Sequence, residues 1–391
     1  MEWSERISPL VEQVAPSGLR QFFDIVSTMK DVVSLGVGEP DFATPKHIIT
    51  ECIHSLEQGK TNYTSNSGLL ELRQEIVKYI ANSYHVSYDV EEEVLVTVGA
   101  SEALDLAVRA IVAPGDEVLI PEPCYVSYQA CVLFAGGTVV PIATSPERGF
   151  RVTADELRAK ITPKTKAIIL GYPNNPTGAI MSRAELQAVA DLAAEYDLLV
   201  ISDELYSELT FDGKHTCFSA LDGMKDRTII LNGFSKSHAM TGLRIGYALA
   251  HPAVIAAMMK IHQYTMLCAP ITSQIAAIEA LKNGQGAMKK MMEQYNKRRK
   301  IMLKGFRDMG LDCFEPQGAF YIFPSIKKTG LSSQEFTEQL LKKEKVAVIP
   351  GHAFGACGEG FIRCSYSYSE EHLREALRRM DHFINSRAVA V

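Results

Sequence analysis

A serine, a lysine and an arginine lie close together in residues 231–250, which read LNGFSKSHAMTGLRIGYALA. The apolar run 228–231 predicts a buried strand that leads into a loop with Ser235 and Lys236, and Arg244 follows eight residues after the lysine. A lysine at the end of a buried strand has a partly desolvated ammonium, and desolvation lowers its pKa toward a nucleophilic amine. Such an amine forms Schiff bases with carbonyl compounds. Ser235 and Arg244 offer a hydroxyl and a guanidinium to a phosphate group.

Apolar runs alternate with amphipathic segments from about residue 46 to residue 280. We expect strands at 94–98, 118–120, 138–142, 167–170, 198–201, 228–231 and 244–250. Continuous apolar strands separated by amphipathic helices predict a mostly parallel sheet that helices cover on both faces. Seven residues separate Lys236 from Arg244, fewer than a parallel crossover needs, so the last strand should return antiparallel. The expected fold is α/β, with a mostly parallel seven-stranded sheet (one antiparallel strand) sandwiched by helices.

The character of the chain changes after about residue 285, where a long helical segment precedes short strands and a terminal helix. We predict a large domain at 46–285, and an N-terminal arm at 1–45 together with a smaller α+β domain at 286–391, onto which the segment around 15–45 packs. Three capping boxes of the form Ser/Thr-x-x-Glu predict where helices begin. They are Thr153 with Glu156, Ser182 with Glu185, and Ser332 with Glu335.

Chemically useful side chains follow several of the predicted strands. They are Ala100 and Ser101 at the start of a helix, Tyr125, Asn175, Asp203 with Tyr206, and Lys236. Each has an ordinary structural explanation, since Asn-Pro-Thr-Gly makes a good turn and an aspartate can cap a helix. Ligands bind beyond the carboxyl ends of parallel strands, however, and all of these residues should meet there. An amine, an acid, hydrogen-bond donors and a phosphate clamp together suit pyridoxal phosphate (PLP) chemistry.

Three motifs in order give the chain a family resemblance: YPNNPTG at 172–178, SDELYSEL at 202–209 and SKSHAMTGLRIG at 235–246. With them the chain resembles the PLP-dependent class I aminotransferases of fold type I, in the branch of bacterial alanine, aromatic and N-acetyl-diaminopimelate aminotransferases. The resemblance covers nearly the whole chain. It implies pyridoxal 5'-phosphate as the cofactor, a homodimer with shared active sites, and closure of the small domain over the substrate.

The resemblance also implies roles for individual residues around the cofactor ring. Lys236 would hold the cofactor covalently and move the 1,3-proton. Asp203 would pair with the pyridinium nitrogen, so that the protonated ring acts as an electron sink. Asn175 and Tyr206 would hydrogen-bond the phenolate oxygen, and Tyr125 would stack on the ring, where family prototypes often have tryptophan.

Two further groups of residues follow from the same resemblance. The phosphate would be bound by Ala100, Ser101, Ser235 and Arg244, with Tyr63 reaching it from the partner subunit. Arg363 would grip the substrate α-carboxylate through a bidentate pair, and Gly38 would offer a backbone N–H to the same group. The segment 16–18 is expected near the pocket for the substrate side chain.

The expected activity is a ping-pong transamination between an L-amino acid and a 2-oxo acid such as 2-oxoglutarate. Because no residue is evidently placed to hold a distal carboxylate, we expect alanine, an aromatic amino acid or an N-acyl-diaminopimelate-like donor before aspartate. Two alternatives stay open. One is a PLP-dependent C–S lyase, and the other is a non-enzymatic aminotransferase-like effector-binding module of a transcription regulator, which the lack of a basic N-terminal extension disfavours.

Composition narrows the class of protein and its partners. The 391 residues are 47% hydrophobic and 22% charged, which is ordinary for a globular protein, and the net charge is −6. No basic run is interleaved with aromatics, so we expect no nucleic-acid partner. The eight cysteines form no CxxC pair and no His lies at metal spacing, which predicts reduced, mostly buried thiols, no metal site and a cytoplasmic location. No apolar run approaches about 18 residues, so no membrane span is expected.

Overall fold

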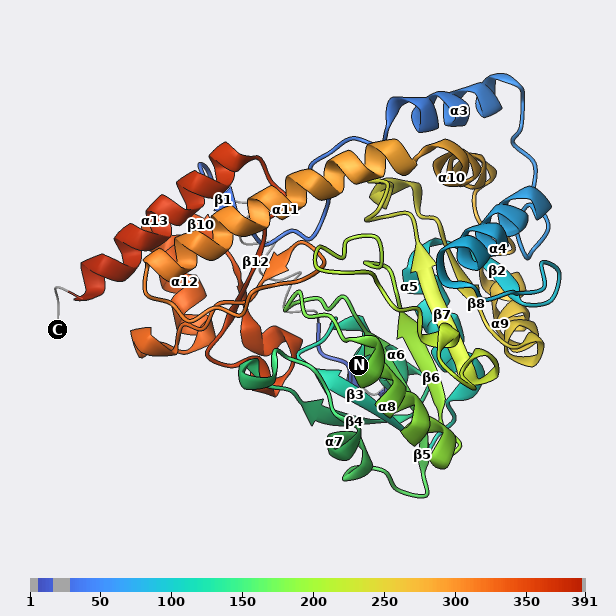
Figure 1. Cartoon of the computed structure of the whole chain (residues 1–391), viewed down its shortest axis with the longest axis horizontal. Coiled ribbons are helices and arrows are strands. Elements are labelled where there is room, and N and C mark those ends of the chain that lie inside the picture. Colours follow the sequence, from blue (N-terminus) through green and yellow to red (C-terminus); the bar gives the residue numbers. More distant parts are fainter. Residues whose placement is uncertain (1–5, 17–28, 389–391) are drawn as a thin grey trace.

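A seven-stranded sheet organises the larger part of the protein (Figure 1). This computed structural model describes residues 6–16 and 29–388. The strands stand in the order β2 (Val94–Thr97), β8 (Gly246–Leu249), β7 (Thr228–Gly233), β6 (Leu199–Asp203), β5 (Thr165–Gly171), β3 (Glu117–Glu122) and β4 (Thr138–Ala143). Only β8 runs antiparallel to its neighbours within this sheet, so the predicted topology is confirmed.

The return from β7 to β8 brings Lys236 and Arg244 to the same end of the sheet. Gly233 pairs with Gly246 across the two strands, so the chain between them forms one closed loop. The predicted strand began at Arg244, but this residue precedes β8 and follows a short 3-10 helix at Thr241–Leu243. Arg244 has a left-handed backbone with φ of 50°, which no strand residue can adopt.

Helices cover both faces of this sheet because its strands are apolar on both sides. One face packs against helices that include α4 (Leu70–Tyr84), α8 (Arg183–Glu195) and α10 (Ile271–Asn283). The other face packs against α5 (Gly99–Ile111), α6 (Ser127–Phe134) and α9 (Pro252–Thr265). Strand β2 shows the alternation directly, since Val94 and Val96 join the first core while Leu95 joins the second.

Local sequence signals set several helix boundaries. The three predicted capping boxes are confirmed, at the starts of α7 (Ala154–Arg158), α8 and α12 (Ser333–Glu344). In each, the cap hydroxyl accepts from the N3 backbone N–H, while the N3 glutamate accepts from the cap backbone N–H. Donors that would otherwise lack partners at the helix start are thereby satisfied. Helix α3 (Lys46–Glu57) starts at a proline cap and packs on α10.

A second core lies beside the large sheet, at the left of Figure 1. Its elements are β1 (Val33–Ser34), α11 (Gln285–Asp308), β9 (Tyr321–Ile322), α12, β10 (Val346–Ala347), β12 (Ile362–Ser365) and α13 (Glu370–Ala388). The short strand β11 (Ile349–Pro350) pairs with β12, but its Ile349 belongs to a core of the large sheet. Strand β1 pairs in parallel with β10, so residues near the start of the chain pack with its last third. The division into domains at residues 46 and 286 stays a prediction.

The cysteines are less buried than predicted. All eight are free thiols, but only Cys124, Cys217 and Cys364 are buried, so the prediction of mostly buried thiols is wrong. Helix α1 (Pro9–Glu12) packs on α6. Within residues 6–16 and 29–388, no helix is long and apolar enough to cross a membrane.

Candidate active site

A cavity of about 380 Å³ opens beyond the carboxyl ends of β5, β6 and β7. It collects predicted residues from both halves of the chain: Gly38, Ala100, Ser101, Tyr125, Asn175, Asp203, Tyr206, Ser235, Lys236, Arg244 and Arg363. Tyr63 is not among the residues lining this cavity, and its side chain is 82% exposed. Of the segment 16–18, residues 17 and 18 lie outside the described residues, so their predicted place near the side-chain pocket is not addressed.

Lys236 extends its amine across the cavity toward the segment that follows β1. Its Nζ donates a hydrogen bond of 2.7 Å to the carbonyl oxygen of Gly38 and lies 5.8 Å from the ring centroid of Phe320. Burial lowers the pKa of Lys236 from 10.5 to about 8, and Arg363 and Arg244 lower it too, against the opposing effect of carboxylates such as Glu39. The amine is therefore much closer to neutrality at physiological pH than an exposed lysine.

Asp203 ends β6 and presents its carboxylate to the same cavity. The hydroxyl of Tyr128 donates to Oδ2 at 2.8 Å, and the backbone N–H of Leu205 donates to Oδ1 at 3.1 Å. Burial raises the pKa of Asp203, while these two hydrogen bonds act in the opposite direction. Tyr128, which lies on α6, was not predicted as a residue of the site.

A cradle for an anion forms where α5 begins. Gly99 has φ of 79°, and a Cβ on it would lie 2.6 Å from a terminal nitrogen of Arg244, so the guanidinium reaches the backbone closely. A Cβ on Gly246 would likewise meet the backbone nitrogen of Ala100 at 2.5 Å. Ser235 is buried nearby. Free N–H groups at a helix start and a guanidinium together suit a phosphate.

Arg363 reaches the opposite side of the cavity from β12. Its guanidinium donates to the side-chain oxygen of Asn175 at 3.0 Å and to the carbonyl of Gly36 at 2.5 Å. It lies between the rings of Tyr321 and Phe354, at 4.6 and 4.8 Å from their centroids. Its Nε is buried and has no hydrogen-bond partner in the described protein, and burial lowers the pKa of the guanidinium. A buried cation with an unused donor suits a carboxylate.

A pair of tyrosines completes the wall of the cavity. The hydroxyls of Tyr206 and Tyr321 are 2.8 Å apart and hydrogen-bonded, and burial raises the pKa of both phenols. A Cβ on Gly38 would lie 2.0 Å from the Tyr321 hydroxyl, so the backbone at Gly38 can approach only because it has no side chain. Tyr321 was not predicted as a residue of the site.

Comparison with known proteins agrees with this geometry. The family described as aminotransferase class I and II matches residues 30–380. YugH of Bacillus subtilis, assigned as an aminotransferase, is 52% identical over 97% of this chain and 98% of its own. The aspartate aminotransferase of Pyrococcus abyssi is 44% identical over 97% of this chain and 99% of its own.

Solved structures give the same result. The aromatic aminotransferase of Pyrococcus horikoshii superposes with a TM-score of 0.90 at 42% identity, covering 95% of this chain and 100% of its own. These relatives are all aminotransferases, which supports transamination over the C–S lyase and effector-binding alternatives. The chain belongs to the aminotransferase class I and II family and is an aminotransferase.

Proposed function

We propose that this aminotransferase uses pyridoxal 5'-phosphate to move an amino group between an L-amino acid and a 2-oxo acid by a ping-pong mechanism. The observation that carries the proposal is Lys236, whose partly desolvated amine shares one cavity with Asp203 and with the anion cradle of Ala100 and Arg244. An amine with its pKa near 8 is suited both to bond a carbonyl compound and to carry protons at neutral pH.

The residues present fit the cofactor. The cradle at Gly99, which a Cβ would fill, would take the phosphate together with Ser101, Ser235 and Arg244. Tyr125 offers a ring for stacking. When bound, PLP supplies an aldehyde for amine exchange and a protonated ring that withdraws electrons from the substrate.

The protein's own groups then handle protons and charge. Lys236 Nζ would take the proton from the α-carbon of the amino acid, and in the second half-reaction it would give a proton to the α-carbon of the incoming 2-oxo acid. Asp203 keeps the ring nitrogen protonated by pairing with it. Tyr206 and Asn175 donate toward the phenolate oxygen. Arg363 and the backbone of Gly38 hold the α-carboxylate, and the buried, partnerless Nε of Arg363 supports that assignment.

We place alanine, an aromatic amino acid or an N-acyl-diaminopimelate-like compound before aspartate as the donor, with 2-oxoglutarate as the acceptor. Support comes from the cations that line the described cavity, which are Lys236, Arg244 and Arg363. Each of them already has a proposed role, so none of these three is left to bind the side-chain carboxylate of aspartate. Relatives named for aspartate and for aromatic amino acids are similarly close, so identity does not decide between them. A half-reaction screen of single amino acids against the cofactor-loaded enzyme, followed by its absorbance, decides the donor.

The active unit is a homodimer in which Tyr63 reaches the partner's phosphate. The support is indirect: Tyr63 is highly exposed, and Ile49, Ile53 and Leu56 on α3 are exposed apolar residues. Light scattering should give the mass of a dimer, and Tyr63→Phe should weaken PLP binding. The small domain closes over the substrate, as the resemblance implies, and the cytoplasmic location stays a prediction.

Replacing Lys236 tests the whole proposal. Lys236→Ala should abolish transamination and the visible absorbance of the covalently bound cofactor, while Lys60→Ala, at an exposed lysine, should change neither. Normal turnover by the Lys236 variant would remove this residue from the mechanism. Pyruvate and ammonia released from a cysteine conjugate without any amino acceptor would instead indicate a lyase.

A further inference from the structure

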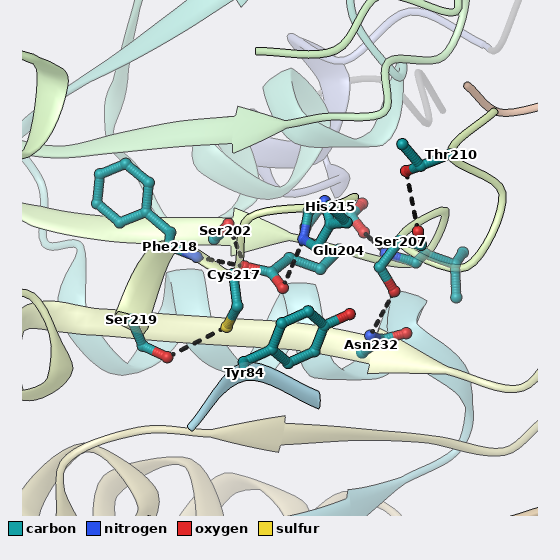
Figure 2. A network of polar contacts seen from close by, with 12 residues as sticks. Tyr84, Ser202, Glu204, Ser207, Thr210, His215, Cys217, Phe218, Ser219 and Asn232 are labelled. Atoms are coloured by element: carbon teal, nitrogen blue, oxygen red, sulfur yellow. Dashed lines mark hydrogen bonds and ion pairs between the residues drawn. The ribbon is translucent and has the colours of Figure 1, made fainter. Parts of the chain in front are cut away.

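A buried carboxylate lies directly behind the cavity, between two residues of the site. Glu204 follows Asp203 in the chain and precedes Tyr206 by two positions, yet it does not line the cavity. Its side chain turns to the opposite side and is only 1% exposed. Figure 2 shows it at the centre of a polar network that includes Ser202, His215 and Phe218. None of the roles assigned above uses this group.

Three donors satisfy the Glu204 carboxylate. The hydroxyl of Ser202 and the backbone N–H of Phe218 donate to Oε1 at 3.0 and 2.9 Å. The imidazole of His215 donates from Nε2 to Oε2 at 2.9 Å. His215 is 10% exposed, and its ring packs edge-on against Tyr84 with centroids 5.8 Å apart. A buried carboxylate is tolerated only with such a set of partners, which makes its position well defined.

The chain beside Glu204 has little regular structure of its own. Strand β6 ends at Asp203, and residues 204–207 form turns before the chain reaches the loop that carries His215. The turn is held at its far side by Asn232 of β7, whose amide donates to the Ser207 hydroxyl at 3.3 Å (Figure 2). Glu204 thus ties the turn to the loop at 215–218, while Ser207 ties it to the strand that leads to Lys236.

Asp203 itself has two hydrogen bonds, one of them from the turn. The donor to its Oδ1 is the backbone N–H of Leu205, and this N–H sits one residue after Glu204. The Glu204 charge also raises the pKa of the neighbouring Asp203 carboxyl, as does burial, which is the larger effect. The charge of Glu204 therefore disfavours the ionised form of Asp203. If Glu204 helps the reaction, it must do so by holding Asp203 in position.

We propose that Glu204 and His215 are positioning residues for the reaction: they hold the turn that sets the orientation of the Asp203 carboxylate and the Tyr206 hydroxyl toward the cofactor. This inference rests on the proposed function, which gives those two residues their roles. Groups that pair with a cofactor must stand within about 0.5 Å of their working position, and an irregular turn does not supply that accuracy by itself.

The test uses variants of the PLP-loaded enzyme. Glu204→Ala should lower kcat about 10–100-fold with a smaller change in the KM for the amino acid, and should shift the pH titration of the bound cofactor's absorbance. Glu204→Gln should stay within about threefold of wild type, because its amide oxygen accepts from Ser202 and Phe218 while its NH2 can keep a hydrogen bond with the ring nitrogen of His215. Glu344→Ala removes a His–Glu pair of similar length, with His382 at 2.8 Å on a more exposed surface of α12 and α13 away from the cavity, and should leave kcat unchanged.

A double-mutant cycle separates positioning from a loss of stability. If Glu204 acts through Asp203 and Tyr206, then Glu204→Ala should lower kcat less in a background that already carries Asp203→Asn than in wild type, so the two effects on kcat are not additive. Additive effects, or a Gln variant as impaired as the Ala variant, would overturn the inference. Should Glu204→Ala fail to fold, His215→Asn takes its place, and an unchanged kcat for that variant would overturn the inference too.

Failure of the proposed function has a different signature. A wild-type protein that binds no PLP or transaminates nothing refutes the cofactor assignment whatever the variants do. A wild-type enzyme that works, together with a fully active Glu204→Ala variant, refutes only the positioning role.

Discussion

The lowered pKa of Lys236 predicts an unusual pH dependence for the reactivity of its amine. A neutral amine is the reactive form, so its rate with an aldehyde follows the neutral fraction. With a pKa of about 8, that fraction is about 9% at pH 7 and about 91% at pH 9, a rise of about tenfold. At the ordinary value of 10.5 it would rise about a hundredfold, from about 0.03% to about 3%.

The assay is reductive methylation of the cofactor-free protein by formaldehyde and cyanoborohydride, with the peptide that contains Lys236 quantified by mass spectrometry. A lysine model peptide in the same tube corrects for the pH dependence of the reagents. The ratio of rates at pH 9 and pH 7 should be about ten for Lys236, with a plateau above pH 9. A ratio near one hundred without a plateau would refute the argument that burial prepares this amine.

Two variants should shift the pKa of Lys236 in opposite directions. The Glu39 carboxylate raises the pKa of Lys236, so Glu39→Gln should lower it further and reduce the ratio below that of wild type. The Arg363 guanidinium lowers the pKa, so Arg363→Gln should raise it and increase the ratio. A higher ratio for Glu39→Gln, or a lower ratio for Arg363→Gln, would contradict the electrostatic explanation.

Other predictions concern single contacts. Tyr128→Phe removes a hydrogen bond of 2.8 Å to Asp203 and so raises the pKa of that carboxyl further. Because a hydrogen bond to a charged group contributes about 1.5–3 kcal/mol, kcat should fall about 10–100-fold. An unchanged kcat would show that this contact has no role in the reaction. Gly38→Ala places a Cβ where the Tyr321 hydroxyl lies and should raise the KM for the amino acid; wild-type kinetics would mean that the backbone there moves freely. Leu340→Ala empties a fully buried site of the second core and should cost about 2–5 kcal/mol of unfolding free energy in urea titrations, and a loss below about 1 kcal/mol would show that the site collapses.

The sequence predicts the large sheet well because its strands obey a simple physical rule. Parallel strands buried on both faces must be apolar throughout, and the run at 198–201 appears in β6 at Leu199–Asp203. The short return loop likewise fixes β8 as antiparallel. Strand ends were less accurate: the strand predicted at 244–250 begins only at Gly246, because Arg244 has a left-handed backbone.

The residues that line the cavity were predictable where chemically useful side chains follow several strands of one sheet, although each type also has ordinary structural uses. A lysine and an aspartate at strand ends are conspicuous, whereas buried tyrosines such as Tyr128 and Tyr321 are indistinguishable from core residues until their hydroxyl partners are known. The Glu204 network was missed for a related reason. Its partner His215 comes from a loop eleven residues later, and no periodic pattern relates loop residues to one another.

The pairing of β1 with β10 has a consequence for synthesis of the chain. Seven strands of the large sheet are complete once residue 249 has left the ribosome, and with them Lys236, Asp203 and the anion cradle. The guanidinium that reaches the carbonyl of Gly36 belongs to a residue 327 positions later. On the proposed function, a nascent chain would therefore complete the residues for the phosphorylated cofactor well before Arg363, the residue proposed to hold the amino acid. Its earliest strand, β1, has no partner until β10 has been synthesised.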